Sequence, residues 1–300
     1  MKSFDLQVNG AFGVDYSSPE MTADDFCRAT EKILETGCTR FLPTVITSSM
    51  DLYRRNLPMI NKEIRRHGWE YELPGFHLEG PFISPEPGAV GAHNPAYTMP
   101  ATMEAFDELY DCAEGRISIL TAAAELPGCD KLIERAHAKG IKVSLGHQMA
   151  NEEQILAAGA DTMTHLGNGL PNLIDRHHNP IWTGLGNDDM TIMAITDGHH
   201  LPAHVVKCFI RAKGVDRFIA VSDASQVSGL PPGKYNVFGN ETILEENGRF
   251  HIPAKNCLCG SSYLMNRCIE FLRREKLLTE EEIETVCWVN PHKLLGLPLD

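Results

Sequence analysis

Histidine and carboxylate side chains stand where several apolar, β-rich runs of this chain end. The stretch "GFHLEGPFIS" places His77 and Glu79 at the end of one such run and then breaks at a Gly-Pro pair, while two later runs end at His147 and His165. A single residue of this kind is more often a hydrogen-bonded core histidine or a capping acid. Several that arrive from separate strands can instead meet at one point and bind a borderline metal ion such as Zn²⁺.

We therefore predict that Glu79, His147 and His165 are metal ligands that leave one position open for water. A metal ion held in this way lowers the pKa of a bound water and polarises a carbonyl oxygen, which are the two requirements of amide hydrolysis. The reaction also needs a general base beside that water. Asp223 in "AVSDAS" ends another β-rich run, and this position fits the role of the base.

Eight β-rich runs alternate with helix-compatible segments, which predicts a (β/α)8 barrel in the α/β class. The active sites of such barrels lie at the carboxyl ends of the strands, where the residues above are found. The eight runs cover residues 4–8, 39–46, 73–79, 116–123, 141–147, 161–166, 191–197 and 217–223.

Helix signals fill the intervals between these runs. The segment "TADDFCRATEKILETG" has a threonine N-cap, acids in its first turn and a glycine stop, and residues 151–160 and 202–214 repeat the pattern. Two more helices, over 261–276 and 279–290, have no strand between them and are expected to close the barrel. No low-complexity linker interrupts the chain, so we expect a single (β/α)8 domain over residues 1–300.

Composition narrows the classes of function. The formal net charge of −13 argues against nucleic acid and anionic membranes as partners, because the long-range field repels polyanions. No apolar run is long enough to span a bilayer, and the first residues lack the apolar core of a secretory signal. The nine cysteines show no paired spacing that suggests a disulfide framework and are expected to be reduced, so we expect a cytoplasmic protein. Neither a glycine-rich phosphate loop nor a serine-hydrolase pattern is found.

The chain resembles the N-acetylglucosamine-6-phosphate deacetylases of the amidohydrolase superfamily over nearly its whole length. The matching stretches follow the family order from residue 5 to 296. They read "DLQVNG", "FLPT", "HLEGPFI", "GAHNP", "SLGHQMA", "THLGNGLP", "DGHHL", "VSDA", "GSS" and "NPHKLLGL". Each fragment is weak alone, and the combination is specific.

The resemblance implies roles for matching residues. It makes the Glu and the two His of the "HLEGP", "GH" and "THL" motifs metal ligands, and it makes Asp223 the acid and base of the reaction. His93 of "GAH" is implied to hold or polarise the acetyl group, and His200 to contact the sugar. The main chain at Asn168 and Gly169 is implied to line the phosphate pocket.

An arginine that binds phosphate in the family has Arg176 as its nearest candidate here, although the surrounding residues differ. A solvated loop arginine is the other interpretation, and a neighbouring subunit is another source of phosphate contacts in the family. The resemblance also implies a homodimer.

Two departures from the pattern bear on the metal and on the domain structure. Gln7 and Asn9 stand where many superfamily members have a His-X-His pair, which is typical of the single-metal branch. We therefore expect one divalent ion, most simply zinc, with iron, manganese and cobalt as alternatives. The small β-sandwich domain usual in the family is expected to be missing.

The favoured function is metal-dependent hydrolysis of the acetamide of N-acetylglucosamine 6-phosphate to glucosamine 6-phosphate and acetate. An amidohydrolase acting on another N-acyl sugar or a cyclic amide would use the same ligands, since fold and metal do not determine the substrate. A non-catalytic phosphosugar-binding homologue is a third possibility, which the presence of a metal set together with Asp223 disfavours.

Overall fold

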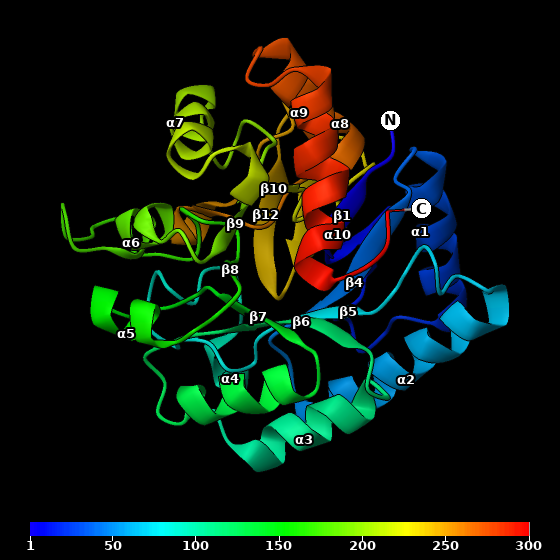
Figure 1. Cartoon of the computed structure of the whole chain (residues 1–300). Coiled ribbons are helices and arrows are strands. Elements are labelled where there is room, and N and C mark those ends of the chain that lie inside the picture. The colour runs from blue at the N-terminus through cyan, green and yellow to red at the C-terminus, as the bar shows by residue number, and fades with distance from the viewer. Residues whose placement is uncertain (300) are drawn as a thin grey trace.

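Eight parallel strands form the centre of the computed structural model, which describes residues 1–299. Each strand pairs with the next one along the chain, and helices surround the strands (Figure 1). All eight predicted strands are present. They are β1 (Phe4–Val8), β4 (Arg40–Ile46), β5 (Phe76–Glu79), β6 (Ile117–Ala122), β7 (Lys142–Leu145), β8 (Thr162–Met163), β9 (Thr191–Ile195) and β10 (Phe218–Val221).

The first and last strands meet just beyond the end of β10. Val8 forms a parallel bridge with Ala224, whose carbonyl accepts a 2.8 Å hydrogen bond from the main-chain N–H of Asn9. We call this junction of β1 and β10 the seam. Further from the mouth along the seam, the Asp5 carboxylate accepts a 3.1 Å hydrogen bond from the main-chain N–H of Ser222. The predicted (β/α)8 barrel is confirmed, and its strand ends face one mouth.

One helix follows each of the first seven strands and covers the outside of the barrel (Figure 1). Thr22 is the N-cap of the first of them, as the sequence predicted, and it forms a capping box with Asp25. The seven helices are α1 (Ala23–Glu35), α2 (Met50–His67), α3 (Met103–Cys112), α4 (Cys129–Ala138), α5 (Glu152–Ala157), α6 (Pro180–Gly186) and α7 (Ala203–Lys213). Their apolar faces pack against the strands in one large buried cluster.

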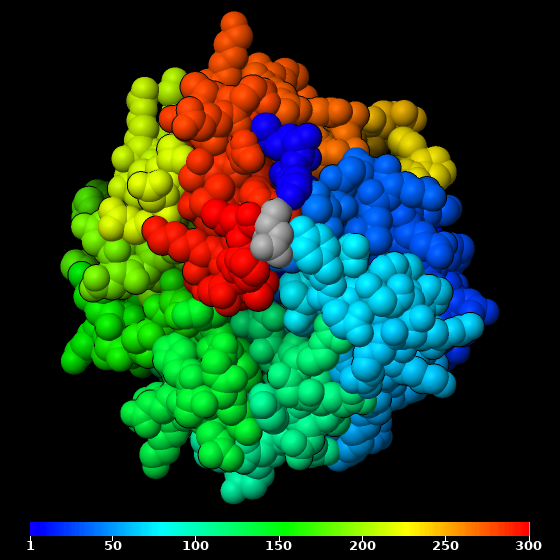
Figure 2. Space-filling view, turned by 45° about the vertical axis from the view of Figure 1, so that its right-hand side comes forward, coloured from blue at the N-terminus to red at the C-terminus, as the bar shows by residue number. Residues whose placement is uncertain are grey.

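The C-terminal segment forms α8 (Met265–Arg274), α9 (Glu280–Glu284), a π-helical turn η4 (Thr285–Val289) and α10 (Asn290–Leu295). It lies beside the N-terminal residues, as Figure 2 shows. Phe4 makes an edge contact with the His292 ring, and Trp288 packs with apolar side chains from β1, β4, β6, β9 and β10. The predicted closing helices therefore fill the end of the barrel opposite the mouth.

A four-stranded antiparallel sheet follows β10, which the sequence analysis did not expect. Its strands are β11 (Gly233–Val237), β12 (Asn240–Leu244), β13 (Phe250–Ile252) and β14 (Cys257–Leu258). It has its own small buried cluster of Val227, Val237, Leu244, Phe250, Ile252 and Cys259. A short hairpin of β2 (Gly10–Ala11) and β3 (Val14–Asp15) follows β1.

Three short 3-10 turns, η1 (Pro95–Tyr97), η2 (Val215–Arg217) and η3 (Pro253–Lys255), lie in the connections between longer elements. Within residues 1–299, none of the helices combines the length and the apolar character that crossing a bilayer requires.

Candidate active site

The three predicted metal ligands meet at the mouth of the barrel. Glu79 is the last residue of β5, while His147 and His165 each lie two residues past the ends of β7 and β8. Oε1 of Glu79 is 2.8 Å from Nε2 of His165 and 3.2 Å from Nε2 of His147. The two imidazole nitrogens are 3.0 Å apart. All three side chains are buried.

This donor set fits a divalent metal ion. Ligand atoms bound at about 2.0–2.2 Å to a tetrahedral ion are separated from each other by about 3.3 Å, close to the spacing seen here. Burial opposes ionisation of Glu79, yet hydrogen bonds to His147 and His165 outweigh it and hold the pKa of this carboxyl well below its usual range. A buried, ionised carboxylate facing two imidazole nitrogens provides the charge and the donor atoms that zinc and similar ions bind.

The orientation of His147 is set by its surroundings. Its Nδ1 donates a 2.7 Å hydrogen bond to the carbonyl oxygen of Ala89, and this contact turns Nε2 toward Oε1 of Glu79, 3.2 Å away. A carbonyl partner of this kind commonly holds a metal-ligating histidine in one tautomer. Two glycines lie close to the ring. A Cβ added at Gly169 would lie 2.8 Å from its Nδ1, and one added at Gly91 would lie 3.2 Å from its Cε1.

His93 lies against the same group from the loop after β5. Its Nε2 is 3.2 Å from Nε2 of His147 and 3.8 Å from Oε2 of Glu79. The ligand atoms of Glu79, His93 and His147 all lie within 4.8 Å of one another. Burial, and then the charge of His147, lower the pKa of His93 to about 3, so its ring is neutral near pH 7. His93 is therefore close enough to serve either the metal or the substrate.

Asp223 lies two residues past the end of β10. Two side-chain amides hold it, one from Gln7 in β1 and one from Asn9, the residue that follows β1. Gln7 Nε2 donates to Asp223 Oδ1 at 3.0 Å and to Glu79 Oε1 at 2.9 Å. Asn9 Nδ2 donates to the same oxygen of Asp223 at 2.7 Å. Burial, and then the charge of Glu79, raise the pKa of Asp223 to about 6. A carboxyl of this pKa can both accept and return a proton near neutral pH.

Backbone strain is concentrated in these residues. His147, His165 and Asp223 all have positive φ angles, of 51°, 29° and 52°. Non-glycine residues rarely adopt this left-handed region, and such outliers cluster at functional sites where the surrounding structure holds them in place. The strain here turns three side chains toward one point at the barrel mouth.

His200, expected to contact the sugar, is fixed by Asp197 just past β9. Its Nδ1 lies 2.8 Å from Oδ2 of Asp197, which also accepts a 2.9 Å hydrogen bond from the hydroxyl of Ser261. Burial opposes ionisation of Asp197, but His200 and two main-chain N–H groups lower the pKa of this carboxyl. An ionised Asp197 therefore orients His200 through Nδ1 and leaves Nε2 for a ligand.

A cavity of about 320 Å³ joins these residues. Its walls contain Glu79, His93, His147, His165, His200 and Asp223, together with Asn9, Asn168 and Gly169. The structure thus brings together every site residue expected from the sequence except Arg176.

Comparisons with known proteins agree with this geometry. No family model matches the chain. The N-acetylglucosamine-6-phosphate deacetylase of Bos taurus is 33% identical to it over 98% of this chain and 73% of its own length. This chain belongs to the N-acetylglucosamine-6-phosphate deacetylase family. The predicted enzyme class, a metal-dependent amidohydrolase, is confirmed with it.

One further relative and one solved structure also resemble this chain. The N-acetylgalactosamine-6-phosphate deacetylase of Escherichia coli O157:H7 is 28% identical over 98% of this chain and 77% of its own length. The crystal structure of N-acetylglucosamine-6-phosphate deacetylase from Thermotoga maritima superposes with a TM-score of 0.87 at 26% identity. That superposition covers 98% of this chain and 78% of the other.

Two sequence candidates lie elsewhere in this deacetylase-family chain. Arg176 is exposed and is not among the residues that line the cavity, so its role in phosphate binding stays a prediction. His77 is a core histidine, because Nδ1 donates to the Leu6 carbonyl at 2.9 Å and Nε2 lies 2.8 Å from the Thr121 hydroxyl. Burial lowers the pKa of His77 to about 4, which keeps the ring neutral. His77 thus braces β5 from inside the barrel.

The sequence analysis missed one wall of the cavity. The four-stranded sheet contributes Phe238, Asn256, Cys257 and Leu258 to the lining. Phe238 occupies the tight turn between β11 and β12 at a φ of 51°. The alternating pattern of "KYNVFGNETIL", with glycine at the turn, is the signal that would have identified this hairpin.

Proposed function

We propose that this protein hydrolyses the acetamide of N-acetylglucosamine 6-phosphate and releases glucosamine 6-phosphate and acetate. The observation that carries the proposal is the approach of Glu79, His147 and His165 within 3.2 Å of one another, beside Asp223, in a single cavity of a chain of this family. The relatives described above are named as deacetylases of N-acetylated sugar phosphates, which favours this reaction over a cyclic amide substrate or a non-catalytic role.

Glu79, His147 and His165 would hold one divalent ion, which we take to be zinc because nitrogen and carboxylate donors in a near-tetrahedral set suit it. When bound, such an ion polarises a carbonyl oxygen and makes a water molecule more acidic. Gln7 keeps the carboxylate of Glu79 in place through its 2.9 Å hydrogen bond.

Asp223 would move the proton. In its ionised form it accepts the proton of the attacking water as the new carbon–oxygen bond forms. It then donates that proton to the sugar nitrogen as the carbon–nitrogen bond breaks, which releases the amine and acetate. The amides of Gln7 and Asn9 hold Asp223 Oδ1 and leave Oδ2 to act.

His93 and His200 would orient the substrate. The neutral His93 ring can donate one hydrogen bond to the acetyl oxygen, whose negative charge grows in the transition state. His200, fixed through Asp197, presents Nε2 to a sugar hydroxyl.

The phosphate would lie against the main chain of Asn168 and Gly169. Among the described residues that line the cavity, none is lysine or arginine. A homodimer whose second subunit brings a cation to the mouth would supply the missing positive charge, and we include this arrangement in the proposal.

Acetate release from a matched panel tests the substrate. The panel contains N-acetylglucosamine and N-acetylgalactosamine, each with and without a 6-phosphate, and is assayed with zinc-loaded and chelator-treated protein. We expect zinc-dependent release that favours N-acetylglucosamine 6-phosphate. N-acetylgalactosamine 6-phosphate is the second candidate, because the Escherichia coli relative is named for it.

Asp223→Asn provides the matched control for the chemistry. It should retain bound zinc while kcat falls by about a thousandfold, within the range that general acid–base groups contribute. Preference for the galacto sugar would change the substrate assignment and leave the reaction intact. Absence of release from every sugar by protein carrying one zinc ion would overturn the proposal.

A further inference from the structure

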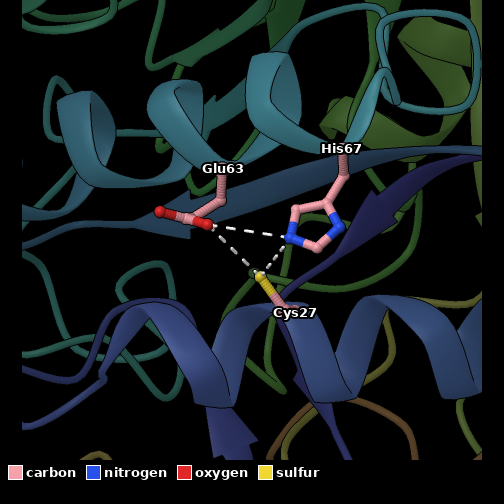
Figure 3. A group of neighbouring side chains, drawn as sticks. All are labelled: Cys27, Glu63 and His67. Carbon is pink, nitrogen blue, oxygen red and sulfur yellow. Dashed lines mark hydrogen bonds and ion pairs between the residues drawn. The ribbon is translucent and has the colours of Figure 1, made fainter.

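A second group of metal-binding side chains lies outside the barrel, between α1 and α2 (Figure 3). Cys27 points from α1 toward Glu63 and His67, which are one turn apart on the same face of α2. The Sγ atom of Cys27 is 3.5 Å from Nε2 of His67 and 3.7 Å from Oε2 of Glu63. The nitrogen and the carboxylate oxygen are 3.8 Å apart. None of the three lines the active-site cavity.

The arrangement differs from a cysteine–histidine–acid nucleophile relay. In such a relay the acid orients the histidine through one ring nitrogen while the other nitrogen faces the thiol. Here the carboxylate and the thiol both approach the same nitrogen, Nε2 of His67. Burial, and then the charge of Glu63, also raise the pKa of the Cys27 thiol to about 11, which disfavours the nucleophilic thiolate.

The three donor atoms instead surround one point. Zinc binds sulfur at about 2.3 Å and nitrogen or oxygen at about 2.0–2.2 Å in a tetrahedral site. Those bond lengths place sulfur about 3.6 Å from each of the other two donors, and nitrogen about 3.4 Å from oxygen. The spacings in the structure are within a few tenths of an ångström of these values.

We propose that Cys27, Glu63 and His67 form a second site for a zinc-like divalent ion, with water in the fourth position. The mixed sulfur, nitrogen and oxygen donors favour zinc or a similar ion over magnesium or calcium, which take oxygen ligands. The ion would join two helices that are otherwise linked by side-chain packing.

Charge and access both suit an ion at this place. The Glu63 side chain is only 4% exposed, and its ion pair with Arg66 at 3.3 Å involves an arginine that is 69% exposed. A cation would therefore balance the charge of a buried carboxylate whose arginine partner is solvated. His67 is 31% exposed, which gives an ion a path from solvent. The His67 ring stacks on Trp69 with centroids 4.4 Å apart, so tryptophan fluorescence should report binding.

Metal content of matched variants tests the site. The full-length protein is dialysed against zinc, and bound metal is counted for wild type, Cys27→Ser, His67→Ala and Cys208→Ser, the last altering an exposed cysteine on α7. We expect Cys27→Ser and His67→Ala each to bind one zinc ion fewer per chain than wild type, and Cys208→Ser to match wild type. Because the test uses a difference, it does not depend on the ion at the barrel mouth.

Cobalt substitution identifies the ligand. A cobalt–thiolate bond gives a near-ultraviolet charge-transfer band, and Glu79, His147 and His165 cannot produce one. The band should be present in wild type, in Cys208→Ser and in Cys257→Ser, which removes the thiol that lines the active-site cavity, and absent from Cys27→Ser. Equal metal counts in all variants, or a band that survives in Cys27→Ser, would overturn the proposal. Should Cys27→Ser misfold, the metal content of His67→Ala still tests the proposal, because His67 is an exposed residue whose replacement is better tolerated.

Discussion

Asn9 donates a 2.7 Å hydrogen bond from Nδ2 to Oδ1 of Asp223 and so joins the first strand of the barrel to the last at its mouth. Burial favours the neutral form of Asp223, whereas a donor of this kind stabilises the ionised form. This hydrogen bond therefore both links the first and last strands and favours the ionised form of the proposed base, Asp223.

The first prediction follows from the sign of this interaction. Asp223 must be ionised to accept a proton, so kcat/KM of the wild type should fall as the pH drops through about 6, the pKa of Asp223. Asn9→Ala removes one hydrogen-bond donor to Asp223 and so raises its pKa. The acid limb of the pH–rate profile should then move to higher pH, and most of the activity should return at alkaline pH. Rate profiles from about pH 5 to about pH 9 measure the shift. An unmoved limb would contradict the role given to Asp223.

The second prediction separates two buried histidines. His165→Asn should lose the active-site metal, because it removes a donor 2.8 Å from Glu79 Oε1. His93→Asn should keep the metal and lose about a hundredfold or more in kcat, in line with the loss of one donor to a developing oxyanion. Metal analysis and kinetics on both proteins distinguish the roles. Metal loss in His93→Asn would make His93 a ligand.

The third prediction concerns the glycine beside His147. Gly169 has a φ of 61°, and a Cβ there would lie 2.8 Å from Nδ1 of His147. Gly169→Ala should therefore displace the imidazole and weaken metal binding by about tenfold or more, as do changes to groups that orient ligands. Gly186→Ala is the matched control, because within residues 1–299 a Cβ there would meet no atom within 4 Å other than those of its chain neighbours and its own helix backbone. Equal metal affinity in the two variants would refute this explanation.

The fourth prediction is a dependence of stability on pH. Burial raises the pKa of Asp5 in the seam to about 7, whereas the pKa in the unfolded chain is about 3.9. The folded protein thus retains a proton on Asp5 that the unfolded chain loses, so the contribution of Asp5 to stability should fall as the pH rises from about 4 to about 7. Each pKa unit corresponds to about 1.4 kcal/mol.

Asp5→Asn tests this prediction. The amide oxygen still accepts from the main-chain N–H of Ser222, and the titrating group is gone. The unfolding free energy of the variant, measured with urea, should decline by a few kcal/mol less over that pH window. Asp15, whose pKa burial also raises to about 7, leaves some slope in both proteins. Parallel curves for the two proteins would argue against a proton on Asp5.

The barrel and most of its mouth were accessible from sequence for a local reason. Each strand is a short apolar run that ends in a polar residue, and parallel strands bring such ends to one edge. Glu79, His147 and His165 were therefore predictable as neighbours. His77 shows the limit of the same pattern, because only its contacts with Leu6 and Thr121 reveal that it is a core residue.

The sequence by itself determined the order of strands and helices, the residues at the strand ends and the family resemblance, because hydrophobic periodicity and motifs are properties of neighbouring residues. Tertiary structure alone decided the contacts outside this predicted set. It placed the hairpin with Phe238 over the cavity, left Arg176 outside the cavity lining and brought Cys27 on α1 to Glu63 and His67 on α2. These contacts depend on how distant segments pack, and no local pattern records the distance between side chains that are tens of residues apart.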